Sequence, residues 1–245
     1  MLEELIEAGL AHLRATPVAM GGDMESMPET PDSRGTPDGA SVNRRTAVYL
    51  GTMSRLRPYE LELMIDTAKT VGQVVPDFEL LVIGDSETES EKGWLARYAR
   101  AQGADCWVRF TGWRPYSEGL TLASSCTLGL SPFPRGPLSE SASPTKVIEY
   151  LTLGLPVVCN DQPDQARVVR ESGGGLCVGL TVDAFAAAIR QLLEEPEQAR
   201  AMGEAGRVCA GQNRDYRSIA TNVAGTLRTL GPHWQVMARR NERCG

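Results

Sequence analysis

Aromatic residues and excess positive charge are both scarce in this sequence. Phe, Trp and Tyr make up 6% of the 245 residues, and the formal net charge at pH 7 is −6. Proteins that hold single-stranded nucleic acid stack its bases on aromatic side chains, and broad affinity for a polyanion needs basic charge. The composition argues against nucleic acid as a partner and against general affinity for an anionic membrane. It leaves room for a small basic pocket that holds a phosphate.

Long apolar runs are also missing. The longest stretch without a charged residue is 119–134, which is short for a membrane-spanning helix and is interrupted by Gly, Ser and Pro. The chain starts Met1-Leu2-Glu3-Glu4, which is acidic where a signal peptide is basic. The sequence therefore predicts no intrinsic membrane span and a cytoplasmic location. Any peripheral contact with the inner face of a membrane is expected through a partner.

Closely spaced cysteine pairs are a third absence. None of the six cysteines forms a CxxC pair, and the gaps between neighbours are long. Zinc sites and disulfide frameworks have characteristic spacings, so we expect no metal site and no disulfide framework. Cys126, Cys159 and Cys177 lie in apolar runs and are expected to be small buried hydrophobic residues in a reducing compartment.

The rest of the composition is that of a soluble globular protein, with 42% apolar and 23% charged residues. Residues 2–14 carry Leu and Ile at helical spacing, whereas residues 16–45 are rich in Pro, Gly, Asp and Ser without any period. We therefore predict an N-terminal helix and linker over residues 1–45, a main domain over 46–230 and a C-terminal tail over 231–245.

From Thr46 onward, short apolar runs alternate with helical stretches. This alternation predicts an α/β fold, namely a Rossmann-like doubly wound parallel sheet covered by helices on both faces. The expected strands are 47–50, 79–83, 107–110, 127–130, 156–159 and 176–178. The expected helices are 61–74, 89–102, 115–124, 145–153, 163–171, 181–194, 197–211 and 214–229.

Ligands of such folds bind outside the carboxyl ends of the strands, so the loops after the strands are the places to search for chemistry. Neither GxxxxGK[ST] nor a GxGxxG after the first strand occurs, which argues against a P-loop and against a dinucleotide cofactor. The loops to inspect are 51–57, 84–86, 111–114, 131–145 and 160–164.

The most informative segment runs from Ser143 to Tyr150. Ser143 is a good helix N-cap and Pro144 suits the first helical position, which places Thr145 and Lys146 in the first turn. Free amides, the helix dipole and a lysine together make an anion site. Glu149 lies one turn further on the same face. An ordinary capped surface helix with a Lys–Glu pair would explain the same residues.

Several motifs of this sequence, taken in order, resemble those of one family. They are 17–23, 48–51 followed by 54–57, 80–85, 110–112, 130–133, and 143–150 followed by 154–158. The last pair reads SPTKxxEY and then GxPVV, and resembles the donor-site signature of retaining glycosyltransferases of the GT-B fold, the glycosyl transferases group 1 type. The resemblance spans about residues 15–230 and implies that this chain is the C-terminal, donor-binding half of a GT-B fold.

The resemblance implies that the domain binds a nucleotide diphosphate sugar, linked to UDP or GDP, as substrate and without a cofactor. Matched residue by residue, Glu149 would bind the ribose hydroxyls, and Lys146 and Arg57 would act on the leaving diphosphate. The other donor-binding residues would be Ser143, Thr145, Arg55, Gly112, Trp113, Arg114 and Glu140, with Asp85 and Ser86 at the edge of the pocket.

The sequence departs from the family pattern in three places. A second glutamate near the donor sugar is replaced by Ser141, with Glu140 one place away, and Thr52 stands where an arginine is usual. Extra residues near 58–60 leave open whether Arg55 or Arg57 meets the diphosphate. These departures concern the arginine and glutamate contacts and leave the SPTKxxEY segment intact.

The family also has an N-terminal domain that binds the acceptor, and this chain starts at the helix and linker that would follow it. We expect an enzyme that transfers a sugar with retention but does so poorly as an isolated chain, and that needs a separate acceptor-binding domain or subunit. The alternatives are a non-catalytic nucleotide-sugar-binding subunit or fragment, a nucleotide-sugar epimerase and a receiver-like signalling domain.

Overall fold

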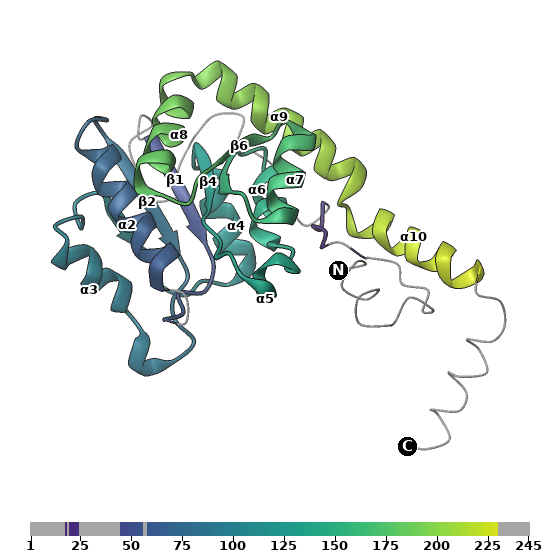
Figure 1. Ribbon diagram of the computed structural model, residues 1–245, viewed down its shortest axis with the longest axis horizontal. Coiled ribbons are helices and arrows are strands. Elements are labelled where there is room, and N and C mark those ends of the chain that lie inside the picture. The colour runs from purple at the N-terminus through teal and green to yellow at the C-terminus, as the bar shows by residue number, and fades with distance from the viewer. Residues whose placement is uncertain (1–17, 19, 25–44, 56–57, 230–245) are drawn as a thin grey trace.

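The computed structural model describes residues 18, 20–24, 45–55 and 58–229 (Figure 1). The helix expected over 2–14, most of the linker expected over 16–45, and the tail expected over 231–245 lie outside the described residues. So does Arg57. The three-part division of the chain therefore stays a prediction.

Six parallel strands form one sheet in the order β3-β2-β1-β4-β5-β6. The chain thus builds outward from β1 in one direction and then, from β4, in the other, which confirms the doubly wound fold. The strands are β1 (Arg45–Leu50), β2 (Phe78–Ile83), β3 (Val108–Phe110), β4 (Leu128–Ser131), β5 (Val157–Asn160) and β6 (Gly175–Val178). Each overlaps a strand expected from the sequence.

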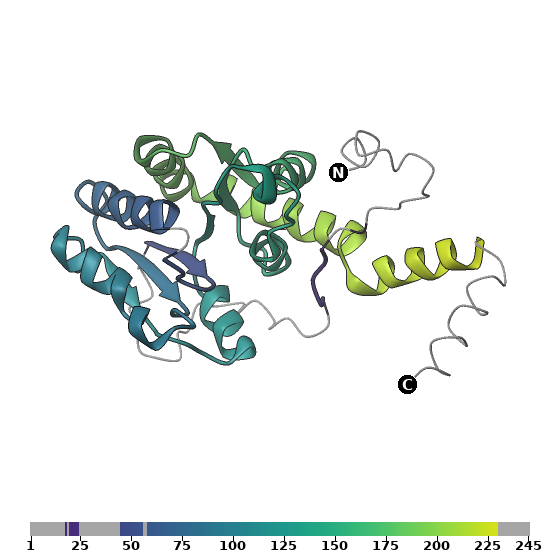
Figure 2. The same ribbon diagram turned by 60° about the horizontal axis from the view of Figure 1, so that its bottom comes forward.

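The helices cover both faces of this sheet (Figures 1 and 2). In chain order they are α2 (Pro58–Gly72), α3 (Trp94–Ala101), α4 (Tyr116–Ser124), α5 (Pro137–Glu140), α6 (Thr145–Thr152), α7 (Pro163–Ser172), α8 (Val182–Glu194), α9 (Pro196–Asn213) and α10 (Tyr216–Thr229). The helix expected over 89–102 is wrong in its first part. A 3₁₀ turn over Glu89–Glu91 precedes α3, because Gly93 adopts φ +66° and breaks the helix between them.

The apolar core is divided into two clusters by the sheet. Alternate strand residues point to opposite faces, so Tyr49 belongs to the cluster under α2, α3 and α8, while Val48 belongs to the cluster under α4, α6 and α7. Both strand residues are at most 2% exposed. Burial of each such side chain contributes about 1.5–3 kcal/mol. This packing fixes the strand ends, where the candidate site lies.

The segment 20–24 lies against the junction of α9 and α10. Gly22 forms a bridge with Asp215, and the amide of Gly22 donates to the carbonyl of Arg214 at 2.8 Å. From this junction α10 runs away from the sheet (Figure 1). A stretch near the start of the chain is therefore anchored to its last described helices.

Candidate functional site

The strand order reverses at the centre of the sheet, where a doubly wound fold is expected to bind its ligand. β1 and β4 are paired parallel neighbours from which the two halves of the sheet extend in opposite directions. Loops that leave two such strands diverge, and the gap between them at the carboxyl ends accepts ligands. Lys146, in the first turn of α6, reaches this point.

The Lys146 ammonium is held against the end of β1. Its Nζ lies 3.2 Å from the Tyr49 hydroxyl and 4.2 Å from the centroid of the Tyr49 ring. A Cβ placed on Gly51, the residue after β1, would lie 3.3 Å from the same Nζ. A cation above an aromatic face is attracted by the ring quadrupole. The structure thus fixes one full positive charge at the mouth of the sheet.

Tyr150 fixes the rest of α6 to the same strand end. Its buried hydroxyl accepts a hydrogen bond of 2.7 Å from the amide of Leu50. Lys146 and Tyr150 are four residues apart, so they share one face of α6 and contact two consecutive residues of β1. Burial raises the pKa of Tyr150 well above its ordinary value, so the hydroxyl stays neutral.

Gly129 in β4 makes room for that contact. A Cβ at this position would come within 2.3 Å of the Tyr150 ring, closer than any real packing contact. The ring therefore lies directly on the β4 backbone. α6 has only eight residues, too few to be stable alone, and its position depends on this packing.

The expectations that Ser143 caps α6 and that Pro144 takes its first helical position are wrong, because Pro144 is itself the N-cap. The helix begins at Thr145, and no side-chain hydrogen bond caps it in the described part of the chain. The Ser143 hydroxyl instead donates to Asp164 Oδ2 at 2.5 Å. A hydrogen bond to a charged carboxylate is stronger than one between neutral groups, and this bond orients the Ser143 hydroxyl toward Asp164. The first-turn amides of α6 then face the strand ends without a side-chain cap, as an anion site requires.

Asp164 also joins the start of α6 to segment 20–24. Its Oδ1 accepts from Arg214 at 3.1 Å and from Arg167 at 2.6 Å. Arg214, 8% exposed, donates onward to the carbonyl of Met20 at 3.0 Å. Burial opposes ionisation of Asp164, but the hydrogen bonds from Ser143, Arg214 and Arg167 outweigh it and lower the pKa of the carboxyl. The network is therefore ionised at neutral pH.

Glu149 lies one turn beyond Lys146 and is half-buried. Its Oε1 accepts a hydrogen bond of 3.0 Å from the hydroxyl of Tyr116, at the start of α4. Burial raises the pKa of Glu149, while the Tyr116 hydrogen bond and the charge of Lys146 act in the opposite direction. Lys146 and Glu149 thus have separate hydrogen-bond partners, unlike an ordinary surface pair on one helix.

The ends of the first three strands form a floor of backbone. The amide of Gly84 donates to the carbonyl of Gly112 at 3.1 Å, and that of Gly51 donates to Ile83 at 3.0 Å. A Cβ on Gly84 would lie 2.2 Å from the carbonyl oxygen of Gly51, so glycine is required there. A small cavity of about 60 Å³ beside this floor is lined by Gly112 and Asp85, among others.

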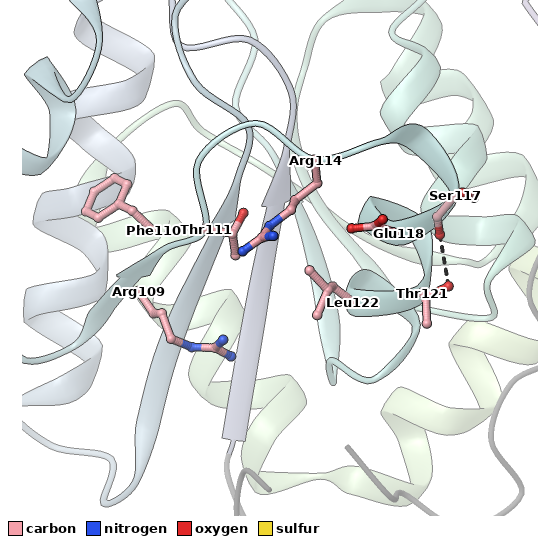
Figure 3. A pocket seen from close by; sticks show the side chains of 8 residues that line it. All are labelled: Arg109, Phe110, Thr111, Arg114, Ser117, Glu118, Thr121 and Leu122. Atoms are coloured by element: carbon pink, nitrogen blue, oxygen red, sulfur yellow. Dashed lines mark hydrogen bonds between the residues drawn. The ribbon is translucent and has the colours of Figure 1, made fainter. Parts of the chain in front are cut away.

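A larger cavity lies between β3 and α4 (Figure 3). It has a volume of about 530 Å³, and Arg114 projects into it from the loop before α4. Trp113, the preceding residue, is 75% exposed. The structure thus separates the two: Arg114 lines a groove on the outer part of the sheet, while the Trp113 ring faces solvent.

The other residues expected to contact the donor are exposed or are paired with neighbouring side chains. Arg55 is exposed, and its amide donates to Glu91 at 3.3 Å. Ser86 is buried and also donates to Glu91, at 3.0 Å, so it serves the loop itself. Thr145 is exposed at the start of α6. Glu140, in the short helix α5, is paired with Arg135 at 2.9 Å.

Sequence reasoning gave no role to five residues that hold the site together. Three are tyrosines that hydrogen-bond or stack on α6 and its neighbours, and two form the partly buried ion pair behind Ser143. They are Tyr49, Tyr116, Tyr150, Asp164 and Arg214. The four-residue spacing of Lys146 and Tyr150 is a signal that could have found one of them. The other four residues contact partners that are distant in the sequence, so no short sequence pattern identifies them.

The sequence and fold were compared with those of known proteins. A sequence model of the family described as glycosyl transferases group 1 matches residues 44–195, more than half of the chain. This chain belongs to that family. A relative from Corynebacterium glutamicum, named GDP-mannose-dependent monoacylated alpha-(1-6)-phosphatidylinositol monomannoside mannosyltransferase, is 27% identical over 181 aligned residues, and the alignment covers 70% of this chain and 46% of the relative.

Solved structures share the fold. Sucrose-phosphate synthase from Thermosynechococcus elongatus aligns with a TM-score of 0.73 at 19% identity, over 93% of this chain and 56% of that one. Anabaena Alr3699/HepE in complex with UDP and glucose gives 0.72 at 18%, over 93% and 60%. This family member therefore spans about half the length of the proteins that it matches.

Among the described residues, no helix is long and apolar enough to cross a membrane. Within the same ranges, no group of three or more His, Cys, Asp or Glu side chains is placed to hold a metal ion.

Proposed function

We propose that this domain binds the nucleotide diphosphate sugar donor of a glycosyltransferase that transfers the sugar with retention. The observation that carries the proposal is the position of Lys146. Its ammonium lies at the strand-order switch, beside Gly51 and at the start of α6. A doubly wound sheet binds phosphates at this point, and a lysine there supplies the charge.

The diphosphate would lie between α6 and the end of β1. The helix start adds about half a positive charge to that of Lys146, because the amide dipoles of α6 are aligned. Arg55 and Arg57 belong to the loop after β1 and would add a guanidinium from the opposite side. As the glycosidic bond to phosphate breaks, negative charge develops on the leaving group, and these cations would stabilise it.

The nucleoside would extend from the diphosphate toward α4. The Glu149 carboxylate can accept hydrogen bonds from two vicinal ribose hydroxyls, and Tyr116 already orients it. The backbone at Gly112 and the exposed ring of Trp113 would border the base. The Corynebacterium relative is named for its dependence on GDP-mannose, which makes that donor the first to test.

Calorimetric titration with GDP, UDP, GDP-mannose and UDP-glucose tests donor binding directly. We expect one of the two nucleotides to bind, and we expect both Lys146→Ala and Glu149→Ala to abolish or strongly weaken its binding. Lys69→Ala is a matched control, because Lys69 lies in the last turn of α2, before the amino end of β2, where its Nζ donates to the Gln102 carbonyl. No binding by the folded wild-type chain, or equal loss in the Lys69 variant, would refute the proposal.

The acceptor would be held by a separate domain or subunit, since a two-domain site excludes water and orients the two substrates. A second candidate is a donor-binding subunit without activity of its own, because Thr52 and Ser141 stand where the family pattern has an arginine and a glutamate. Incubation with the bound donor distinguishes the two. Release of sugar in the donor's anomeric configuration, followed by proton NMR, supports a retaining catalytic domain, whereas an intact donor supports the second candidate.

A further inference from the structure

Two cysteines outside the donor site face each other across β5 and β6. In the parallel register of these strands Cys159 is the direct partner of Cys177. Both lie on the α7 side of the sheet, where Cys159 is fully buried and Cys177 packs half-buried against the same cluster. Adjacent strands are about 4.8 Å apart, and disulfides join residues with Cα atoms about 4.4–6.8 Å apart. The backbone therefore already has the spacing that a disulfide needs.

The surroundings of Cys177 favour a thiolate. Arg170, on α7, donates from Nη2 to Cys177 Sγ at 3.3 Å. The hydrogen bond from the Cys159 thiol and the Arg170 charge lower the pKa of Cys177 to about 7, although burial and the Asp161 carboxylate oppose them. The same hydrogen bond, with burial, raises the pKa of Cys159. Of the two sulfurs, the more exposed one, Cys177 Sγ, therefore loses its proton first.

Other described cysteines lack this combination. Cys126 is buried, and burial raises the pKa of its thiol to about 12, so it is inert. Cys106 is exposed but forms part of no such pair, and Cys209 accepts only a weak contact from Asn213 at 3.5 Å. The expectation that Cys177 is simply a buried hydrophobic residue is therefore wrong, because the strand register gives it a thiol partner and α7 gives it a cation.

We propose that Cys177 and Cys159 form a peroxide-sensitive modification site that closes to an intrachain disulfide. The Cys177 thiolate attacks the O–O bond of a hydroperoxide. An S–O bond forms, the O–O bond breaks, and the departing oxygen takes up a proton, which leaves a sulfenic acid on Cys177. Cys159 then attacks that sulfur, so that an S–S bond forms, the S–O bond breaks and water leaves with the Cys159 proton. The two thiols supply the two electrons that reduce the peroxide.

Peptide mass spectrometry on the full chain tests the proposal. The reduced protein is treated with increasing hydrogen peroxide, its remaining thiols are alkylated, and it is digested with trypsin without reduction. Trypsin places Cys159 in peptide 147–167 and Cys177 in peptide 171–190, with one cysteine in each. We expect these two peptides to appear joined, with the loss of two hydrogen atoms, before exposed Cys106 is oxidised. Earlier oxidation of Cys106, or sulfinic acid on Cys177 without the joined peptide, would overturn the proposal.

Variants separate the two steps. Cys159→Ser keeps a hydroxyl donor beside Cys177, and we expect it to accumulate a sulfenic acid there that dimedone labels. Arg170→Gln removes the cation, and we expect alkylation of Cys177 at pH 7 to slow several-fold, with the difference lost at high pH. Unchanged alkylation, or no dimedone adduct in a variant that melts like the wild type, would refute the mechanism. None of these readouts uses a donor sugar, so the outcome is independent of the proposed transferase function.

Discussion

The two sides of the candidate site differ in how they are built. On the side of α6, Lys146 is held by the hydroxyl and ring of Tyr49. Ser143 is held by Asp164, which in turn is paired with Arg214. On the side of β1, the loop that leads to α2 presents exposed Arg55, whose described anchor is a backbone contact to Glu91. A preorganised charge loses little entropy when a ligand binds, whereas an exposed arginine loses about 2 kcal/mol of rotamer freedom. If the diphosphate binds at the start of α6, the helix side would hold it with a preorganised charge and the loop side would adapt to it.

The largest effect on stability is expected at Gly129, where the Tyr150 ring of α6 packs directly on the β4 backbone. Gly129→Ala would place a methyl group 2.3 Å from the Tyr150 ring and force α6 away from β4. We expect a loss of about 3 kcal/mol in the free energy of unfolding, or failure to fold, since overpacking a core costs about 1–3 kcal/mol and the clash is with a ring on backbone. Urea unfolding measures it. Gly225→Ala on α10, where a Cβ meets nothing within 4 Å, is the matched control and should be neutral or stabilising.

The second prediction compares how much Lys146 and Arg55, one cation from each side of the site, contribute to nucleotide diphosphate binding. We expect Lys146→Ala to weaken nucleotide diphosphate binding about 100-fold and Arg55→Ala about threefold, because a buried or fixed charge is worth more than an exposed one. Titration calorimetry gives both values under one condition. If Arg55→Ala had the larger effect, the fixed side would not be the phosphate side and the comparison would fail.

Removal of the Tyr150 hydroxyl tests whether its hydrogen bond from β1, which positions α6, contributes to donor affinity. Tyr150→Phe keeps the ring on Gly129 but deprives the Leu50 amide of its acceptor. We expect a loss of about 1 kcal/mol in stability and a several-fold weaker donor affinity, since an unsatisfied buried amide costs about 1–3 kcal/mol. Thermal unfolding and calorimetry measure the two effects. A change in stability with unaltered affinity would mean that Tyr150 supports the fold without positioning Lys146.

The smallest change in stability is expected for a substitution of Glu149, and the sign of that change tests the raised pKa of its carboxyl. Its pKa is raised in the folded protein, so the folded state binds a proton more readily than the unfolded chain and the ionised carboxylate destabilises the fold at neutral pH. We expect Glu149→Gln to melt at the same or a slightly higher temperature than the wild type at pH 7. The difference should vanish as the pH falls below the ordinary range of glutamate, while donor affinity at pH 7 is lost. A lower melting temperature at pH 7 would contradict this sign.

The strands and most helices could be predicted because each follows from a short pattern of residues in the sequence. Every expected strand overlaps an observed one, since a buried parallel strand is a short apolar run that needs no partner to be seen. The split of the expected helix at Gly93 was missed because a single glycine with positive φ depends on what surrounds it. In the candidate site, the start of α6 was located to the residue, but the role of Ser143 was not, because its acceptor Asp164 lies 21 residues further along the chain.

By itself the sequence determined the α/β class, the order of the strands along the chain, and the short segment in which a lysine begins a helix after the fourth strand. The spacing of apolar residues and the residue types within each short motif carry that information, and each acts over a few residues. Only the tertiary structure decided which side chains meet: Lys146 with Tyr49, Tyr150 with Leu50 and Gly129, and Cys159 with Cys177. These contacts follow from sheet order and register. Both are set by the packing of the whole core, so no local pattern encodes them.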